Sequence, residues 1–305
     1  MFLINEPHDF PVGACKSLEK IGPVYKQGLQ YDPKFIKVVF IRLSVKVDSE
    51  FLGRYPALTH IVSPTTGLNH IDMIEVARRK IRVIALKGEV SFLNDIHATA
   101  EHTLALALAL IRKIPNAADA VTKGLWDRYP FKGTEINGST VLVIGYGRVG
   151  KQVSKLYEAF GARVIAFDDD IRVVPKKYDV MLKEGIQSAD IISIHIPYSE
   201  KNIGFMSEKL FSCCKSTAVI INTSRGEVVD QSALLKCLVD GKLAGAALDV
   251  LRAEPSPFNH ELEKAISQLE HRLVITPHIA GFTQESLDKV ETYVVDLLLQ
   301  DMALE

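Results

Sequence analysis

Residues 141–150 read VLVIGYGRVG, an apolar run that leads into three glycines spaced as G-x-G-x-x-G. The run predicts a buried strand, and the residues after it predict a helix. Gly145 suits a tight turn, Gly147 leaves room for a pyrophosphate, and Gly150 lets helix and strand pack closely. We interpret the stretch as a dinucleotide-binding loop at the start of a doubly wound parallel sheet.

The loop and the strand after it define the expected cofactor site. Tyr146, Arg148 and Val149 lie between the glycines and belong to the same predicted site. Asp168 ends the next predicted strand, 18 residues after Gly150. Its carboxylate can accept hydrogen bonds from ribose hydroxyls and repel a 2′-phosphate, which favours NAD over NADP.

Neighbouring charges bear on the choice of cofactor. Two further acids, Asp169 and Asp170, add to the repulsion of a 2′-phosphate, whereas Arg172 keeps NADP as an alternative. The competing interpretation is a structural turn with incidental acids. That interpretation would require the spacing of the strand, the glycines and Asp168 to match a dinucleotide-binding site by chance.

The rest of the chain alternates strand and helix patterns, which predicts parallel α/β units. Strands are expected at 2–4, 24–26, 37–43, 60–62, 82–86, 141–145, 163–167, 191–195, 218–222, 245–249 and 274–276. Helices between the early strands are expected at 14–21, 48–52 and 70–79, and a last helix at 285–299 is expected to return to the first unit.

These patterns predict an α/β protein of two domains. A Rossmann-type NAD-binding domain is expected over 99–283, and a smaller flavodoxin-like α/β substrate domain over 1–98 and 284–305. A long apolar helix at 99–114, ended by Pro115, and a turn-rich arm at 124–133 with Trp126 are expected to form a homodimer contact.

Composition excludes several classes of function. The 305 residues carry a net charge of −1, so no basic surface for nucleic acid is expected. The apolar run at 103–111 is too short to span a membrane, and the N-terminus has no secretory pattern. We expect a cytoplasmic protein. The four cysteines have no metal-ligand spacing, so free thiols are favoured over a strained Cys213–Cys214 disulfide and no metal is expected.

Three charged residues follow neighbouring strands of the second unit. Arg225 follows the run 220–223, Glu254 opens the loop after 246–249, and His278 follows the last strand. Ligands bind at the carboxyl ends of parallel strands, so these side chains should share one site. Each alone has a plain structural explanation, as a turn arginine, a solvated loop acid or a structural histidine. Their joint placement favours a catalytic site.

Reduction of a carbonyl beside a carboxylate requires these three residue types. A guanidinium can hold the carboxylate in a two-pronged contact. An imidazolium can donate a proton to the carbonyl oxygen as hydride reaches carbon. A carboxylate bonded to the imidazole orients it and favours its charged form. The predicted activity is therefore hydride transfer between NAD and a small 2-hydroxy or 2-keto acid.

The sequence resembles the D-isomer-specific 2-hydroxyacid dehydrogenases, which include D-3-phosphoglycerate dehydrogenase, D-lactate dehydrogenase and glyoxylate/hydroxypyruvate reductase. The resemblance covers about 42–283 and rests on motifs at 145–150, 195–197, 222–230, 245–250 and 277–281. It implies that Arg225, Glu254 and His278 are the catalytic residues.

The resemblance also implies cofactor contacts that the residues alone do not indicate. Asp249 would hold the nicotinamide carboxamide, and His195, Pro197 and Thr223 would line the cofactor cleft. In the first domain, the backbone around Thr65, Thr66 and Gly67 would bind the substrate carboxylate and complete the substrate contacts of Arg225 and His278.

Some positions depart from the family pattern. Residues 63–67 read SPTTG where many relatives have R-x-G-x-G, and 87–98 also differ. Both changes argue against phosphoglycerate as substrate. Arg42 occupies a position where phosphoglycerate dehydrogenases often carry an arginine, and it either binds a phosphate or caps a strand. The C-terminal regulatory domain of longer phosphoglycerate dehydrogenases is not expected in this sequence, which ends at residue 305.

Two other functions are compatible with parts of the sequence. Formate dehydrogenases share the architecture but carry glutamine in place of the catalytic acid, so Glu254 argues against them. Corepressor-like relatives use the fold as an NAD(H)-sensing interaction module and retain the triad. The lack of an appended peptide-binding or low-complexity segment makes a sensor the second choice.

Overall fold

The computed structural model describes residues 1–254, 256 and 258–303. The chain forms two compact units, Met1–Ile96 with Phe282–Glu305 (unit 1) and His97–Gly281 (unit 2). Both boundaries lie two residues before the positions expected from the sequence. Pro255, which follows Glu254, and the last two residues of the expected substrate domain, 304 and 305, lie outside the described residues.

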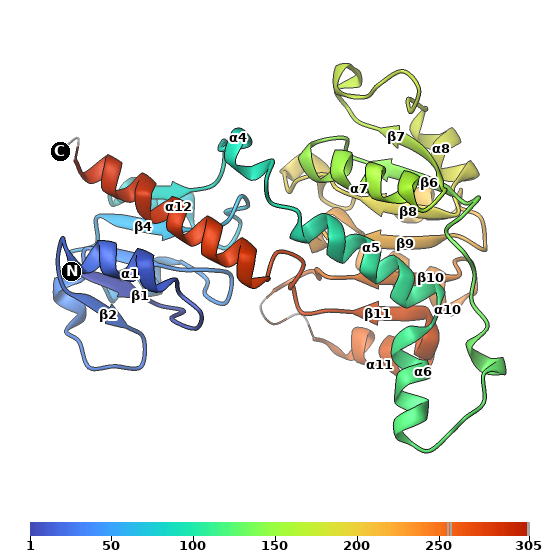
Figure 1. The fold of residues 1–305 in the computed structure, drawn as a ribbon, viewed down its shortest axis with the longest axis horizontal. Helices are drawn as coiled ribbons and strands as arrows, with labels where there is room; N and C mark the ends of the chain where they lie inside the picture. Colours follow the sequence, from blue (N-terminus) through green and yellow to red (C-terminus); the bar gives the residue numbers. More distant parts are fainter. Residues whose placement is uncertain (255, 257, 304–305) are drawn as a thin grey trace. The chain divides into compact units, whose positions relative to one another are not determined.

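Unit 1 is a five-stranded parallel sheet in the order β2-β1-β3-β4-β5 (Figure 1). This is the flavodoxin-like order, so the expected class of the smaller domain is confirmed. Its strands are β1 (Phe2–Ile4), β2 (Val24–Lys26), β3 (Val38–Phe40), β4 (His60–Ser63) and β5 (Arg82–Ala85). Its helices are α1 (Val12–Glu19), α2 (Ser49–Gly53), α3 (Met73–Arg78), α4 (Val90–Leu93) and α12 (Gln284–Met302).

Helix α12 completes the core of unit 1, as expected. Thr283 caps its N-terminus, because the Thr283 side chain accepts a hydrogen bond from the backbone of Ser286. The helix packs on α1, β4 and β5, and its side chains Val290, Val294, Val295 and Leu298 belong to the same core cluster as those of β1 and β3. Each buried aliphatic side chain of this size stabilises the fold by roughly 1.5–3 kcal/mol. The last helix is therefore an integral part of the unit.

Unit 2 is a six-stranded parallel sheet in the order β11-β10-β9-β8-β6-β7. Its strands are β6 (Thr140–Ile144), β7 (Arg163–Phe167), β8 (Ile191–Ile194), β9 (Val219–Asn222), β10 (Gly245–Leu248) and β11 (Leu273–Ile275). β7 pairs with one side of β6 and β8 with the other, so the topological switch lies between β6 and β8. Beyond β7, a single bridge from Ala166 to Asp179 occupies the position of a third strand.

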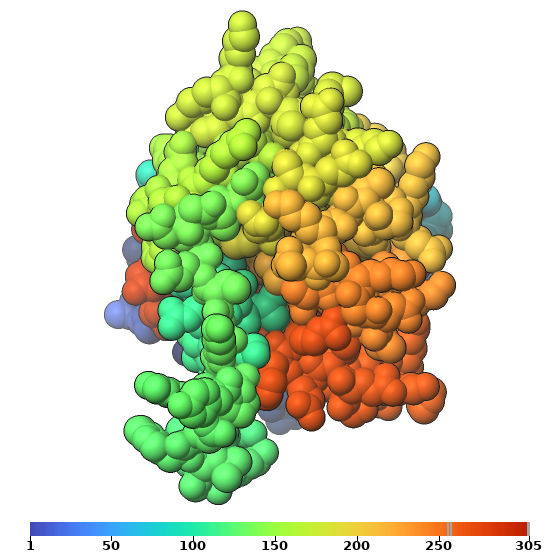
Figure 2. Space-filling model, turned by 90° about the vertical axis from the view of Figure 1, so that its right-hand side faces the viewer, coloured from blue at the N-terminus to red at the C-terminus, as the bar shows by residue number. Residues whose placement is uncertain are grey.

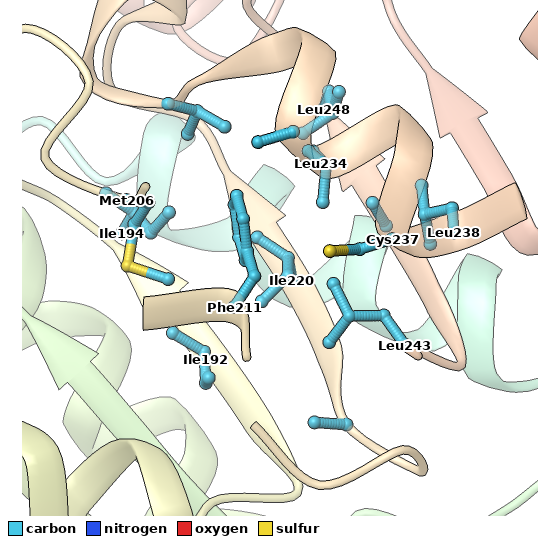
Figure 3. Close-up of a cluster of buried hydrophobic side chains, with 14 of the residues drawn as sticks. Ile192, Ile194, Met206, Phe211, Ile220, Leu234, Cys237, Leu238, Leu243 and Leu248 are labelled. Atoms are coloured by element: carbon cyan, nitrogen blue, oxygen red, sulfur yellow. The ribbon is translucent and has the colours of Figure 1, made fainter. Parts of the chain in front are cut away.

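Helices cover both faces of the unit 2 sheet, which is why its strands are apolar throughout. They are α5 (Ala98–Ile111), α6 (Ile114–Thr122), α7 (Arg148–Ala159), α8 (Leu182–Ser188), α9 (Glu208–Phe211), α10 (Gln231–Val239) and α11 (His260–Leu269). Figure 3 shows part of one core, where side chains from β8 and β9 meet Phe211, Leu234 and Leu238. The second core lies under α5 and α7.

The expected helix at 99–114 is shorter than predicted. Helix α5 ends at Ile111, and Lys113 adopts a left-handed conformation with φ 54° before α6 begins. Pro115 lies in the first turn of α6 and does not end a helix there. Proline is tolerated in a first turn because its missing N–H would have no partner in the helix. The apolar pattern continued through the break, so it did not show where the chain turns.

Helix α6 and the residues after it form an arm that projects from unit 2 (Figure 2). The base of the arm is fixed, since the Lys113 ammonium donates to the Pro130 carbonyl at 2.9 Å and the Phe131 ring packs on His271. Within the arm, Trp126 is 91% exposed. Leu125 and Tyr129, close to it in the chain, are also mostly exposed.

Among the described residues, no helix is long and apolar enough to cross a membrane. Within the same part of the chain, no group of three or more His, Cys, Asp or Glu side chains is placed to hold a metal ion. All four cysteines are free thiols, and only Cys237 is fully buried.

Candidate active site

The glycine loop has the geometry of a phosphate site. Gly145 has φ 92°, and a Cβ there would lie 2.7 Å from the His195 carbonyl carbon, so the loop presses against the end of β8. A Cβ at Gly150 would lie 2.0 Å from the Gly145 oxygen. At Gly147, a Cβ would meet nothing within 4 Å, and no side chain caps the start of α7. This open space at a helix N-terminus fits a pyrophosphate.

Asp168 is held beside that loop. Its Oδ2 accepts a hydrogen bond of 2.8 Å from the Tyr146 amide, and its Oδ1 accepts one of 2.9 Å from the Asp170 amide. Each carboxylate oxygen has a second lone pair, which remains for a ribose hydroxyl. The Arg172 guanidinium binds both oxygens of Asp170 at 2.7 and 2.8 Å, so its charge is already paired.

The other predicted cofactor residues contribute backbone or lie deeper. Tyr146 is buried, and its ring packs on Tyr178 with 5.6 Å between centroids. The Thr223 hydroxyl is buried and bonded to that of Thr103 at 2.7 Å. After β8, the Pro197 carbonyl accepts a hydrogen bond from the side-chain amide of Asn202. Arg148 and Val149 form the first turn of α7, where burial lowers the pKa of Arg148.

His195 stands at the end of β8, next to the switch point between β6 and β8. Its Nε2 is 2.8 Å from the Ser193 hydroxyl. Burial lowers the pKa of His195 to about 3, so the ring is neutral at physiological pH. A neutral imidazole at this position can exchange hydrogen bonds with a bound cofactor without adding charge.

Arg225 follows β9 and is positioned by close backbone packing. A Cβ at Gly226 would lie 2.0 Å from the Leu251 carbonyl carbon, so only glycine lets this turn meet the loop after β10. The guanidinium donates to the Ser224 carbonyl at 2.6 Å. Burial lowers the pKa of Arg225, and the nearby carboxylates of Glu227 and Glu254 oppose this effect. The side chain therefore stays cationic close to Glu254.

Glu254 and His278 form a direct pair. Glu254 Oε2 is 2.5 Å from His278 Nδ1, while Oε1 accepts from the Leu251 amide at 2.7 Å. A carboxylate only accepts, so Nδ1 carries the proton in this pair and Nε2 is the atom that gains or loses one. The structure thus brings Arg225, Glu254 and His278 together in unit 2, whereas Thr65, Thr66 and Gly67 belong to unit 1.

His278 has a strained backbone that Asp249 supports. Its φ is 55°, a left-handed value that is uncommon for a residue with a side chain. The His278 amide donates to the Asp249 carbonyl at 2.8 Å. The amides of Ile279 and Ala280 donate to the Asp249 carboxylate at 2.9 and 2.8 Å. This buried acid therefore fixes the loop that carries the histidine.

Hydrogen bonds keep Asp249 ionised despite its burial. Burial alone would raise the pKa of this carboxyl, but donors from His102, Thr276 and the loop amides hold the pKa below its ordinary value. Because these donors occupy much of its acceptor capacity, Asp249 has few lone pairs left for a cofactor.

In unit 1, the predicted substrate loop follows β4. The Thr65 hydroxyl bonds to Ser63 and to the Gly67 carbonyl, both at 2.9 Å, which shapes the turn that includes Thr66. Arg42 follows the neighbouring strand β3, at the same edge of the sheet. Its Nε donates to Glu291 at 2.6 Å, and both side chains are almost wholly buried. The burial and pairing of Arg42 therefore argue against the first of its two proposed roles, the binding of a substrate phosphate.

The sequence did not indicate His102, Thr276 or Ser193. Each contacts a predicted site residue, but His102 and Thr276 are 174 positions apart in the chain. No spacing pattern connects residues so distant. Ser193 alternates with His195 along β8 and could have been found from the two-residue period of a strand.

Fold and site together define a dinucleotide-binding protein of the oxidoreductase type. Residues 104–280 match the family described as D-isomer specific 2-hydroxyacid dehydrogenase, NAD binding domain. A glyoxylate reductase of Thermofilum pendens is 35% identical over 257 residues, which cover 81% of this chain and 73% of that protein. A D-3-phosphoglycerate dehydrogenase of Archaeoglobus fulgidus is 34% identical over 88% of this chain and 49% of its own length.

A solved structure extends the likeness to the whole chain. The D-lactate dehydrogenase of Aquifex aeolicus, complexed with NAD and lactic acid, has a TM-score of 0.81 and 26% identity. It covers 99% of this chain, which in turn covers 95% of that protein. By contrast, this chain spans about half the length of the curated phosphoglycerate dehydrogenases it matches. The chain belongs to the D-isomer-specific 2-hydroxyacid dehydrogenases, a family of NAD-dependent oxidoreductases, and unit 2 is its NAD-binding domain.

Proposed function

We propose that this protein interconverts a small, unphosphorylated D-2-hydroxy acid and its 2-keto acid. The observation that carries the proposal is the pairing of Glu254 with His278 at 2.5 Å, with the Arg225 guanidinium close enough for its charge to interact with Glu254. Such a site provides an anion clamp and a proton donor side by side. The buried pairing of Arg42 with Glu291 supports a substrate without phosphate.

Each side chain has a distinct task in the proposed mechanism. Bound nicotinamide supplies or accepts the hydride at the substrate C2 carbon. Arg225 holds the substrate carboxylate through its remaining N–H donors. His278 delivers a proton from Nε2 to the carbonyl oxygen during reduction and removes it during oxidation. Glu254 keeps the proton on Nδ1 and stabilises the imidazolium.

The adenosine end of the cofactor is proposed to select NAD. Asp168→Ala should weaken NADH binding and reduce the discrimination against NADPH, because it removes the ribose acceptor and the charge that repels a 2′-phosphate. Fluorescence titration with both cofactors measures this. The exposed ion pair of Glu208 with Lys236 provides the control, since Glu208→Gln removes a surface charge outside the cofactor site. Unchanged cofactor preference in Asp168→Ala would contradict the role of this residue.

Turnover of a panel of 2-keto acids with NADH tests the activity. We expect reduction of one or more of glyoxylate, pyruvate and hydroxypyruvate. A silent panel combined with intact NADH binding would instead support the second function considered, an NAD(H)-sensing interaction module.

Replacement of the histidine tests the mechanism. His278→Ala should lower kcat for keto-acid reduction by about 10²–10⁴-fold with NADH affinity preserved, because only the proton transfer is lost. His260→Ala, at the exposed start of α11, is the control on a histidine outside the site. Turnover close to wild type in His278→Ala would overturn the assignment.

We also propose that the protein acts as a homodimer in the cytoplasm. The support is the anchored arm with its exposed Trp126 and the half-exposed apolar face of α5. Four free thiols are the ordinary state of cysteines in that reducing compartment.

A further inference from the structure

His102 lies on α5, far in sequence from the catalytic residues, and reaches the loop that carries His278. Its Nε2 is 3.1 Å from the Thr276 hydroxyl and 3.4 Å from Asp249 Oδ1. The Thr276 hydroxyl is 2.5 Å from the same carboxylate oxygen. His102 is only partly exposed, with 20% of its side chain accessible.

The direction of these hydrogen bonds follows from chemistry. A carboxylate only accepts, so the single proton of the Thr276 hydroxyl points to Asp249. The hydroxyl oxygen must then accept from His102, which places a proton on His102 Nε2. One chain of donors therefore runs from His102 through Thr276 to Asp249.

Asp249 in turn fixes the backbone of residues 278–280, the loop that carries His278. Its carbonyl and both carboxylate oxygens accept from the amides of His278, Ile279 and Ala280. The left-handed backbone of His278 costs on the order of 1–3 kcal/mol and persists only where the surroundings determine it. A carboxylate free to rotate would let the loop relax.

We propose that His102 is a positioning residue that locks the Asp249 carboxylate and thereby holds His278 in its working orientation. The inference rests on the proposed dehydrogenase function for its effect on turnover. His102 needs no contact with substrate for this role. It differs from a general packing role because only the hydrogen-bond donor at Nε2 matters.

A set of variants distinguishes the effect of losing the hydrogen-bond donor from the effect of changing the side-chain volume. His102→Leu and Thr276→Val remove the hydrogen bonds, whereas His102→Gln and Thr276→Ser keep a donor at similar positions. His60→Gln is the matched control, because His60 is a buried histidine that lies 3.2 Å from Asp301 and belongs to unit 1.

Amide hydrogen exchange measures how firmly the loop is held, and it needs no substrate. The amides of 278, 279 and 280 should exchange faster in His102→Leu and Thr276→Val, and at wild-type rates in His102→Gln and His60→Gln.

Steady-state kinetics measure the effect of the same variants on turnover. His102→Leu should lower kcat by about 10–100-fold with NADH affinity unchanged, since a displacement of about 1 Å has effects of this size. The double variant should be no slower than the slower single variant, because both act on one network.

Wild-type exchange at the three amides in His102→Leu would overturn the inference. Equal losses in His102→Gln and His102→Leu would also overturn it, since volume and not the donor would then matter. If exchange rises as expected but the wild type reduces none of the keto acids, the proposed function fails while the support of the loop by His102 stands. The two failures are thus distinguishable.

Discussion

His195 shows how burial at one residue changes the behaviour of the protein with pH. The unfolded chain protonates this ring near its ordinary pKa of 6.5, while burial keeps the folded ring neutral until the pH reaches about 3. Because the folded pKa is depressed, the unfolded state binds more protons between these values. The free energy of unfolding should therefore fall as the pH falls from 6.5 toward 3, by up to about 1.4 kcal/mol per pH unit from this residue.

His195→Gln should make this acid-side loss shallower, because glutamine binds no proton in either state. Urea denaturation of the cofactor-free protein across that pH window measures the slope. Parallel stability curves for wild type and variant would show that the folded ring titrates near its ordinary pKa. The carboxyl groups titrate equally in both proteins, so the difference isolates His195.

At the same scale, the sequence predicted that Arg225, Glu254 and His278 lie together but did not predict the residues that support them. Arg225, Glu254 and His278 follow strands, and strand ends of a parallel sheet converge, so position along the chain was enough. The left-handed φ of His278 has no such signal, since a positive φ is uncommon for residues with a side chain and no glycine marks the position. Likewise, the contact of His102 with Asp249 exists only because α5 packs on the sheet.

Among the elements, the turn after β9 depends on one glycine. Gly226→Ala should destabilise the protein by about 1–3 kcal/mol and lower kcat, because the new methyl group would push the Arg225 turn away from residues 251 and 252. Gly53→Ala in α2 is the matched control, since a Cβ there meets nothing within 4 Å. Thermal unfolding and turnover of both variants measure the effect. Equal stability of the two would contradict close packing at Gly226.

Strand and helix types were predictable at this scale, and element ends were less so. The eleven observed strands all fall on predicted ones because buried parallel strands are short apolar runs. The break between α5 and α6 was missed, because alanine and leucine suit both helices and a left-handed lysine has no pattern of its own. The bridge at Asp179 was also missed, since a single bridged residue leaves no strand-like run.

At the scale of the whole molecule, the arm formed by α6 and the residues after it leads to a prediction about dimer formation. Light scattering should show a dimer for the wild type and a shift toward monomer for Trp126→Ser, because the variant removes a large apolar side chain from the proposed contact. Ile74→Ser is the control, as Ile74 is 84% exposed on α3 of unit 1. A monomeric wild type, or a dimer unaffected by Trp126→Ser, would contradict the proposal.

The way the chain threads through its two units has a consequence for biosynthesis. Unit 2 is one uninterrupted stretch, whereas unit 1 needs residues from both ends of the chain. On the ribosome, the NAD-binding unit can fold as soon as residue 281 has emerged. The first 96 residues must wait for α12, with the apolar side chains of β4 and β5 only partly covered until this helix arrives. The first part of the protein to be synthesised is thus the last to be completed, and this interval is when the nascent chain most needs protection from aggregation.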